Sequence, residues 1–209
     1  MKHALTIGCG SKNGKTIIDT LLEKNYLVTN IGSSSHPGAH NVTVNWNDIK
    51  IPDIHKIVKF NHDLDFVFFN HNASSLKDKD FDFINTDTLS VWKLVKDWQK
   101  THWLSCQMPL LMLHGLRENL SRDTKVGFML SSFVDWTKSN AAEFPDYSSQ
   151  KYFNYLAMRC LSQHYQSFGI MPNFSKKDSQ NKLKQIISTV CDQTVNGDIF
   201  NFEQFTSKE

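Results

Sequence analysis

The 209 residues include 40% hydrophobic and 12% aromatic residues, enough for a sizeable core, so we expect a single domain over residues 1–209. The net charge of +2 is spread along the chain without a basic run, which argues against nucleic acid or an anionic membrane as a partner. The four cysteines are scattered and no apolar run has the length of a membrane helix, which is typical of a cytoplasmic protein with reduced thiols.

The chain opens with a strand, a glycine-rich turn and a helix. His3–Ile7 is a short apolar run of strand type, and a helical pattern follows over Lys15–Lys24. Between them lie Gly8, Gly10 and Gly14. This order places backbone N–H groups and a helix N-terminus where a pyrophosphate can bind.

The second predicted strand, Tyr26–Ile31, ends in a turn rich in serine. No acidic residue follows it; the chain continues Gly32-Ser33-Ser34-Ser35. An Asp or Glu at this point would bind the ribose 2′-hydroxyl of NAD and repel a 2′-phosphate. Hydroxyls and backbone N–H groups can instead accept a phosphate, and Lys12 can add positive charge. For a dinucleotide site, this pattern favours NADP over NAD.

Three further strands are expected between residues 42 and 130. Val42–Val44 is short, Leu64–Phe69 runs into Asn70, and Val126–Leu130 runs into Ser131-Ser132. The last two have the composition of buried strands, and each runs into small polar residues. Because the segment between the second and fourth strands is short, we expect a turn there in place of a long helix.

Tyr147 and Lys151 lie four residues apart at the start of a helical run, Tyr147–Ser167. Both side chains then occupy one helix face, where the ammonium can lower the pKa of the phenol and make it a proton donor and acceptor. The same spacing also occurs in solvated surface pairs. The pair is therefore a candidate acid–base site for hydride-transfer chemistry only in combination with the other segments.

Together these segments resemble the short-chain dehydrogenase/reductase family in register over almost the whole chain. Gly8, Gly10 and Gly14 resemble its Thr-Gly-x-x-x-Gly-x-Gly turn, Tyr147 and Lys151 its Tyr-x-x-x-Lys pair, and 71–74 (His-Asn-Ala-Ser) its Asn-Asn-Ala-Gly segment. The resemblance implies a doubly wound α/β fold of Rossmann type, with a mostly parallel sheet, helices on both faces and the cofactor at the carboxyl edge.

The resemblance also implies roles for particular residues. Tyr147 would exchange a proton with the substrate oxygen, Lys151 would lower the Tyr147 pKa and bind the nicotinamide ribose, and Ser132 would orient the substrate carbonyl. Ser105 stands where the family's active-site Asn anchors a water, and Asn45-Trp46 where it contacts adenine. The expected cofactor contacts are Gly8, Gly10, Ser11, Lys12, Asn13, Gly14, Ser33, Ser34, Asn45, Trp46, Asn72, Ala73, Tyr147 and Lys151.

Several departures from the family pattern leave a second hypothesis open. Lys12 replaces the middle glycine, Ser105 replaces the Asn, and Ser175-Lys176-Lys177 stands in place of a Pro-Gly segment that lines the nicotinamide. The chain after it is too short for the usual lid helices over the substrate. The leading hypothesis is an oxidoreductase acting on a carbonyl or alcohol, and the alternative is a dinucleotide-binding sensor or partner subunit without turnover.

Two other readings have less support. Gly8 to Gly14 followed by Lys15 and Thr16 resembles a phosphate-binding P-loop, but the spacing is one residue too long and Cys9 stands where a glycine is needed. His36 and His40 are close in sequence, but they flank a Pro-Gly turn and no third ligand is near, so no metal site is expected.

Two long segments also predict self-association. The helices expected near Trp98–Asn119 and Tyr147–Ser167 carry apolar residues over much of their circumference. One sheet cannot cover that much apolar surface. A symmetric helix-pair interface, and therefore a homodimer or homotetramer, is expected.

Overall fold

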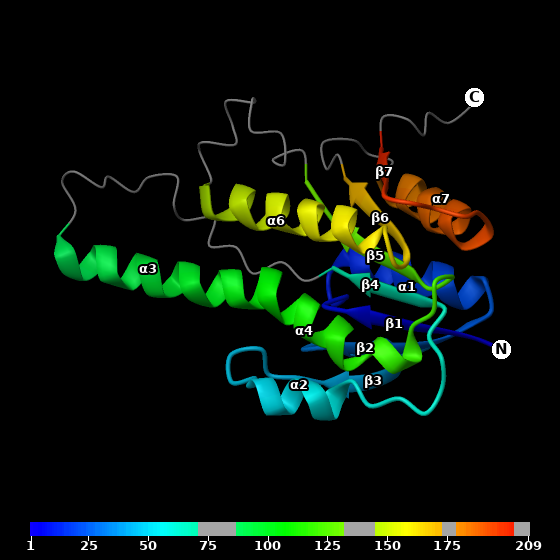
Figure 1. The fold of residues 1–209 in the computed structure, drawn as a ribbon, viewed down its shortest axis with the longest axis horizontal. Coiled ribbons are helices and arrows are strands. Elements are labelled where there is room, and N and C mark those ends of the chain that lie inside the picture. The colour runs from blue at the N-terminus through cyan, green and yellow to red at the C-terminus, as the bar shows by residue number, and fades with distance from the viewer. Residues whose placement is uncertain (71–86, 132–144, 173–178, 203–209) are drawn as a thin grey trace.

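The computed structural model describes residues 1–70, 87–131, 145–172 and 179–202. Seven strands form one sheet in the order β3-β2-β1-β4-β5-β6-β7, and every pairing between neighbours is parallel (Figure 1). The strand order reverses between β1 and β4, which is where parallel sheets of this kind bind ligands at their carboxyl edge. The predicted Rossmann-like fold is confirmed. The strands are β1 Lys2–Ile7, β2 Tyr26–Gly32, β3 His40–Thr43, β4 Phe66–Phe69, β5 Lys125–Met129, β6 Gln166–Met171 and β7 Asp198–Asn201.

Helices cover both faces of the sheet. One face packs against α1 and α7 and the other against α2, α4 and α6, while α3 extends away from the sheet (Figure 1). In β4, Phe66 and Phe68 point to the first core and Val67 and Phe69 to the second. All four are buried, as expected for a central parallel strand covered on both faces. The helices are α1 Lys12–Glu23, α2 Ile51–Ile57, α3 Thr88–His102, α4 Met108–Gly115, α6 Pro145–Leu161 and α7 Ser179–Asp192, with a π-helix at Trp103–Gln107 and a 3₁₀-helix at Arg117–Asn119.

Three predicted elements differ from the structure in kind or by more than one helical turn. The expected turn before β4 is the seven-residue helix α2, which buries Ile54. The helix expected to start near Trp98 begins at Thr88, because the Asp87 side chain accepts hydrogen bonds from two N–H groups of the first turn. The helix expected to reach Ser167 ends at Leu161, since Ser167 belongs to β6. Within the described residues, no helix is long and apolar enough to span a membrane.

Candidate functional site

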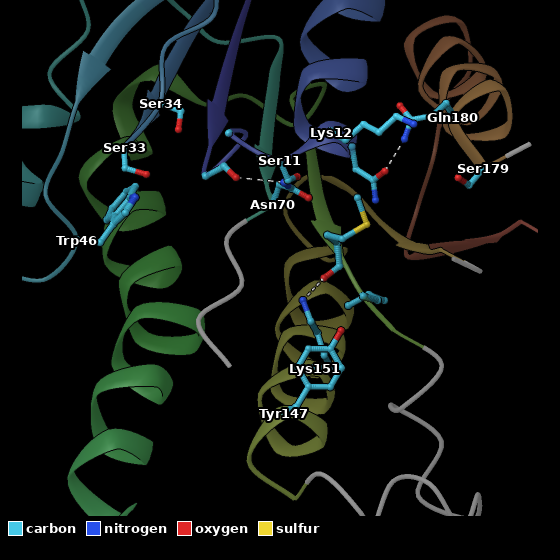
Figure 2. Close-up of a pocket in the computed structure, with 15 residues that line it drawn as sticks. Ser11, Lys12, Ser33, Ser34, Trp46, Asn70, Tyr147, Lys151, Ser179 and Gln180 are labelled. Atoms are coloured by element: carbon cyan, nitrogen blue, oxygen red, sulfur yellow. Dashed lines mark hydrogen bonds between the residues drawn. The ribbon is translucent and has the colours of Figure 1, made fainter. Parts of the chain in front are cut away.

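A cavity of about 670 Å³ opens at the carboxyl edge of the sheet, beside the reversal between β1 and β4 (Figure 2). Its size is within the range of small-molecule and cofactor pockets, roughly 300–1,000 Å³. It brings together residues from the glycine turn, from the segments that follow β2, β3 and β4, from the end of β5 and from the helices α1, α6 and α7. The lining residues are Gly8, Gly10, Ser11, Lys12, Asn13, Ser33, Ser34, Trp46, Asn70, Met129, Leu130, Tyr147, Lys151, Ser179 and Gln180.

The glycine turn is fixed by close contacts that leave no room for side chains. A Cβ on Gly14 would lie 2.4 Å from the Cα of Cys9, and a Cβ on Gly10 would lie 2.8 Å from Ser34 Oγ. Gly8 has a φ of 73°, in the left-handed region that glycine adopts easily. Helix α1 therefore starts directly after the turn, with its N-terminus beside the cavity. Such an N-terminus suits an anionic group.

Asn70 joins this turn to the end of β4. Its Nδ2 donates hydrogen bonds to Gly8 O and Ser11 Oγ, both at 3.1 Å. Ser11 is the N-cap of α1, and its Oγ accepts from the N–H of Gly14 at 3.2 Å. From the sequence, Asn70 is only the polar end of a strand, since no local pattern shows that β4 lies next to β1.

Lys151 forms part of the buried wall at the other end of the cavity. It is 2% exposed, and its Nζ donates a hydrogen bond of 2.9 Å to the carbonyl oxygen of Met129 in β5. The same Nζ lies 5.5 Å from the centroid of the Tyr147 ring (Figure 2). Burial lowers the pKa of Lys151 to about 8. The helical spacing thus brings the two side chains together, as predicted.

The predicted effect of Lys151 on the tyrosine is corrected by the structure. The pKa of Tyr147 is raised above its ordinary value, and desolvation by burial is the main cause. A hydrogen bond with the Ser131 side chain acts in the opposite direction. The neighbour that lowers the Tyr147 pKa is therefore Ser131, while Lys151 is engaged with the β5 carbonyl.

Ser131 has no role predicted from the sequence. The predicted catalytic serine, Ser132, lies outside the described residues, as do Asn72 and Ala73. Ser131 is buried two residues after the end of β5 and interacts with Tyr147. The contact between Ser131 and the tyrosine joins distant parts of the chain, so no local pattern reveals it.

Some predicted residues do not line the cavity. Ser105 is buried in the π-helix at Trp103–Gln107, so its predicted role in holding a water stays a prediction. Asn45 is exposed, and its side chain hydrogen-bonds with Asp48. Gly14 contributes through its contact with the Cys9 backbone instead of through the cavity wall.

Lys12 and the serines of the β2–β3 loop lie at separate places in the cavity. Lys12 extends from the start of α1 toward Gln180, whereas Ser33, Ser34 and Trp46 lie on the opposite side of the cavity (Figure 2). This arrangement gives no support to the predicted contribution of Lys12 to binding a 2′-phosphate at the serine turn. The position of Lys12 instead suits a phosphate group bound near the N-terminus of α1.

Ser179 and Gln180, at the first turn of α7, complete the cavity and were not predicted. The Nε2 of Gln180 donates a hydrogen bond of 2.8 Å to Asn13 Oδ1, and the Thr16 hydroxyl donates to Gln180 Oε1. These bonds tie the N-terminus of α7 to that of α1. The two helices are distant in sequence, so no local pattern could reveal the contact.

A metal-binding arrangement is not found in the described part of the chain, where no three His, Cys, Asp or Glu side chains come together. His36, one of the two histidines considered for a metal, instead pairs with Asp19 of α1, with 3.0 Å between Nε2 and Oδ1.

Comparison with known proteins identifies the fold. The sequence matches no protein-family model and no curated protein. Solved structures do match over nearly the full length. A putative short-chain alcohol dehydrogenase from Burkholderia multivorans aligns with a TM-score of 0.76 at 13% identity, covering 100% of this chain and 99% of that one. The chain has the short-chain dehydrogenase fold.

Two further solved structures have this fold, and one of them was solved with a bound dinucleotide. A carbonyl reductase from Pseudomonas aeruginosa PAO1 has a TM-score of 0.74 at 15% identity, with 98% of each chain covered. The protein BdcA, solved in complex with NADPH, has a TM-score of 0.73 at 11% identity, with 96% of this chain and 92% of that chain covered. At these identities the likeness concerns the fold, and activity has to be argued from the site itself.

Proposed function

We propose that this protein is an NADP-dependent oxidoreductase of the short-chain dehydrogenase type, acting on a carbonyl or alcohol with Tyr147 as the acid–base residue. The observation that carries this proposal is one cavity with a tyrosine and a buried lysine at one end and a glycine turn with a helix N-terminus at the other. A binding module has no need of a phenol beside an ammonium, whereas hydride transfer to a carbonyl needs a proton donor.

The residues of the cavity suit a nicotinamide dinucleotide. Gly10 and Gly14 allow close approach of the backbone, and the first turn of α1 can receive the pyrophosphate. Trp46 offers a flat face for adenine, and Lys12 can pair with a phosphate. The dinucleotide, when bound, supplies or accepts the hydride. In our proposal Lys151 binds the nicotinamide ribose, as the family resemblance implies.

Tyr147 would give its hydroxyl proton to the substrate oxygen during reduction. A raised pKa keeps the phenol protonated at neutral pH, so the tyrosine is ready to donate. Ser131 would hydrogen-bond the phenol and steady its orientation, while Ser132 remains the proposed partner of the substrate carbonyl. Lys151, with a pKa of about 8, is mostly charged at neutral pH, and the N–H groups that it does not use on Met129 O would donate to the ribose.

The preference for NADP rests on the serine turn after β2. Ser33 and Ser34 line the cavity, and no Asp or Glu is among the described lining residues. A carboxylate would repel a 2′-phosphate, while hydroxyls can donate to it. A protein with the same fold binds NADPH. We therefore expect NADPH to bind more tightly than NADH.

The decisive experiment measures cofactor binding and turnover together. Titration with NADPH and NADH, followed by energy transfer from tryptophan, tests binding directly, because Trp46 lines the cavity. A screen of carbonyls with NADPH and of alcohols with NADP⁺ tests turnover. Equal affinity for the two cofactors, or a preference for NADH, would remove the NADP assignment. Failure to bind either would remove the whole proposal.

A second candidate is a dinucleotide-binding sensor or partner subunit without turnover. Ser105 in place of an Asn, buried away from the cavity lining, favours this reading. Dinucleotide binding without any reaction in the screen would support it over the enzyme.

We also propose that the protein is a cytoplasmic homodimer or homotetramer. Leu110 on α4 and Leu156 on α6 are 37% and 44% exposed, which supports a helix-pair interface.

A further inference from the structure

A buried amide lies in the middle of β2, where an apolar residue would be expected. Asn30 is 1% exposed, and Val28 and Ile31 nearby are buried core residues. Burying an amide costs free energy unless its hydrogen bonds are satisfied. Its Nδ2 donates to Ser34 O at 2.9 Å and to Asn41 Oδ1 at 3.2 Å, and its Oδ1 accepts from Thr6 Oγ1 at 3.4 Å. We attribute the amide at this position to the hydrogen bonds that it makes, and not to the packing of the core.

A second amide, Asn41 of β3, holds the rest of the same loop. Its Nδ2 donates to His36 O and Ala39 O, both at 2.8 Å, and its Oδ1 accepts from the N–H of His36 at 2.9 Å. The His36 ring in turn contacts Asp19 of α1 at 3.0 Å. The loop of residues 33–39 is therefore attached to β2, to β3 and to α1.

The exposed side of this loop faces the cavity. Ser33, Ser34 and Ser35 are exposed, and the first two line the cavity. Ser34 lies against the glycine turn, since a Cβ on Gly10 would come within 2.8 Å of its Oγ. Because Lys12 extends to the other side of the cavity (Figure 2), recognition at the serines depends on how well their hydroxyls are placed.

We propose that Asn30 and Asn41 are positioning residues that hold Ser33 and Ser34 as a preformed site for a phosphate monoester, the 2′-phosphate of the dinucleotide. This inference rests on the proposed function and adds to it the residues that set cofactor selectivity. Hydrogen bonds to a phosphate are short and strict in geometry. A receptor that is ordered before binding avoids the entropy cost of ordering it.

Two ligands isolate this effect: adenosine 2′,5′-bisphosphate and adenosine 5′-monophosphate, which differ only in the 2′-phosphate. The main variant is Asn30→Val, since valine suits a buried parallel strand. The second is Asn41→Ala, at a residue that is only partly buried. The ratio of the two affinities should fall about tenfold or more in both variants, the size expected from losing well-placed hydrogen bonds to a charged group. Affinity for the monophosphate should stay roughly unchanged.

Asn119→Ala is the matched control. The Nδ2 of Asn119 also holds a loop through two carbonyls, Phe60 O at 3.1 Å and His62 O at 2.9 Å, but this residue does not line the cavity. Its loss should leave the affinity ratio unchanged even if stability falls.

Three outcomes overturn the inference, and they can be told apart. If both Asn30→Val and Asn41→Ala weaken the two ligands by the same factor, the amides are merely structural and the proposed function stands. If the wild-type protein binds both ligands equally, there is no 2′-phosphate site to position. If it binds neither ligand, nor NADPH, the proposed function fails as well. Should Asn30→Val not fold, the partly buried Asn41→Ala decides between these outcomes.

Discussion

Replacing Lys151 by methionine should make the protein more stable at neutral pH while it removes function. The ammonium is buried and its pKa is lowered from 10.5 to about 8 by desolvation. The fold therefore carries a charged group that would be more stable in water. Methionine is unbranched and adaptable in cores, so its side chain can occupy the same buried position without a charge. Stability sacrificed for a functional group is a common pattern.

The magnitude follows from the pKa shift and the lost hydrogen bond. A shift from 10.5 to about 8 corresponds to about 3 kcal/mol of unfavourable free energy while the lysine is charged. Losing the bond from Nζ to Met129 O costs about 1 kcal/mol. Lys151→Met should thus raise the free energy of unfolding at pH 7 by about 2 kcal/mol, which is a rise in Tm of about 4–8 °C for a domain of this size.

The advantage of the variant should shrink as the pH rises. Below pH 8 the lysine is protonated in both the folded and the unfolded protein, so the full penalty applies. Between about pH 8 and 10.5 the folded protein releases its proton first, and the stability of the wild type rises with pH. At about pH 9.5 the wild type should have recovered about 2 kcal/mol relative to the variant.

Urea unfolding of both proteins at pH 7 and at about pH 9.5 measures this directly. Comparing them at the same pH cancels the titration of every other group. A variant that is less stable than the wild type at pH 7, or an advantage that does not change with pH, would refute the reasoning about the buried charge.

Three further predictions concern the site and the assembly. Tyr147→Phe should lower turnover of any accepted carbonyl by about 10²–10⁴-fold with cofactor binding retained, and Tyr152→Phe on the same helix should leave turnover unchanged; an unaffected rate in Tyr147→Phe would show that this phenol is not the acid. Gln180→Ala should weaken NADPH binding, measured by titration, because the cavity loses the bond that Gln180 donates to Asn13 and the bond that it accepts from Thr16; unchanged affinity would mean that this contact matters only for folding. Light scattering at micromolar concentration should show a dimer or tetramer, whereas a monomer alone would count against the exposed leucines as an interface.

Apolar runs predicted five of the strands. The ends of several helices could not be predicted in this way, because they depend on capping side chains and on which residues pair with the sheet. The β1 and β4 strands were evident from their apolar runs. The start of α3 at Thr88 depends on the Asp87 cap, and the end of α6 at Leu161 on the chain joining β6. Intrinsic helix preference does not contain this information, because tertiary pairing decides which residues leave the helix.

The sequence by itself determined the first five strands, the glycine turn and the pairing of Tyr147 with Lys151, since each depends on residues close together in the chain. Only the tertiary structure decided that Lys151 is buried against β5, that Ser131 meets the tyrosine, that Gln180 joins α7 to α1, and that two asparagine amides, Asn30 and Asn41, bind the serine loop. Desolvation and contacts between distant segments exist only once the sheet is assembled, so no local pattern can specify them.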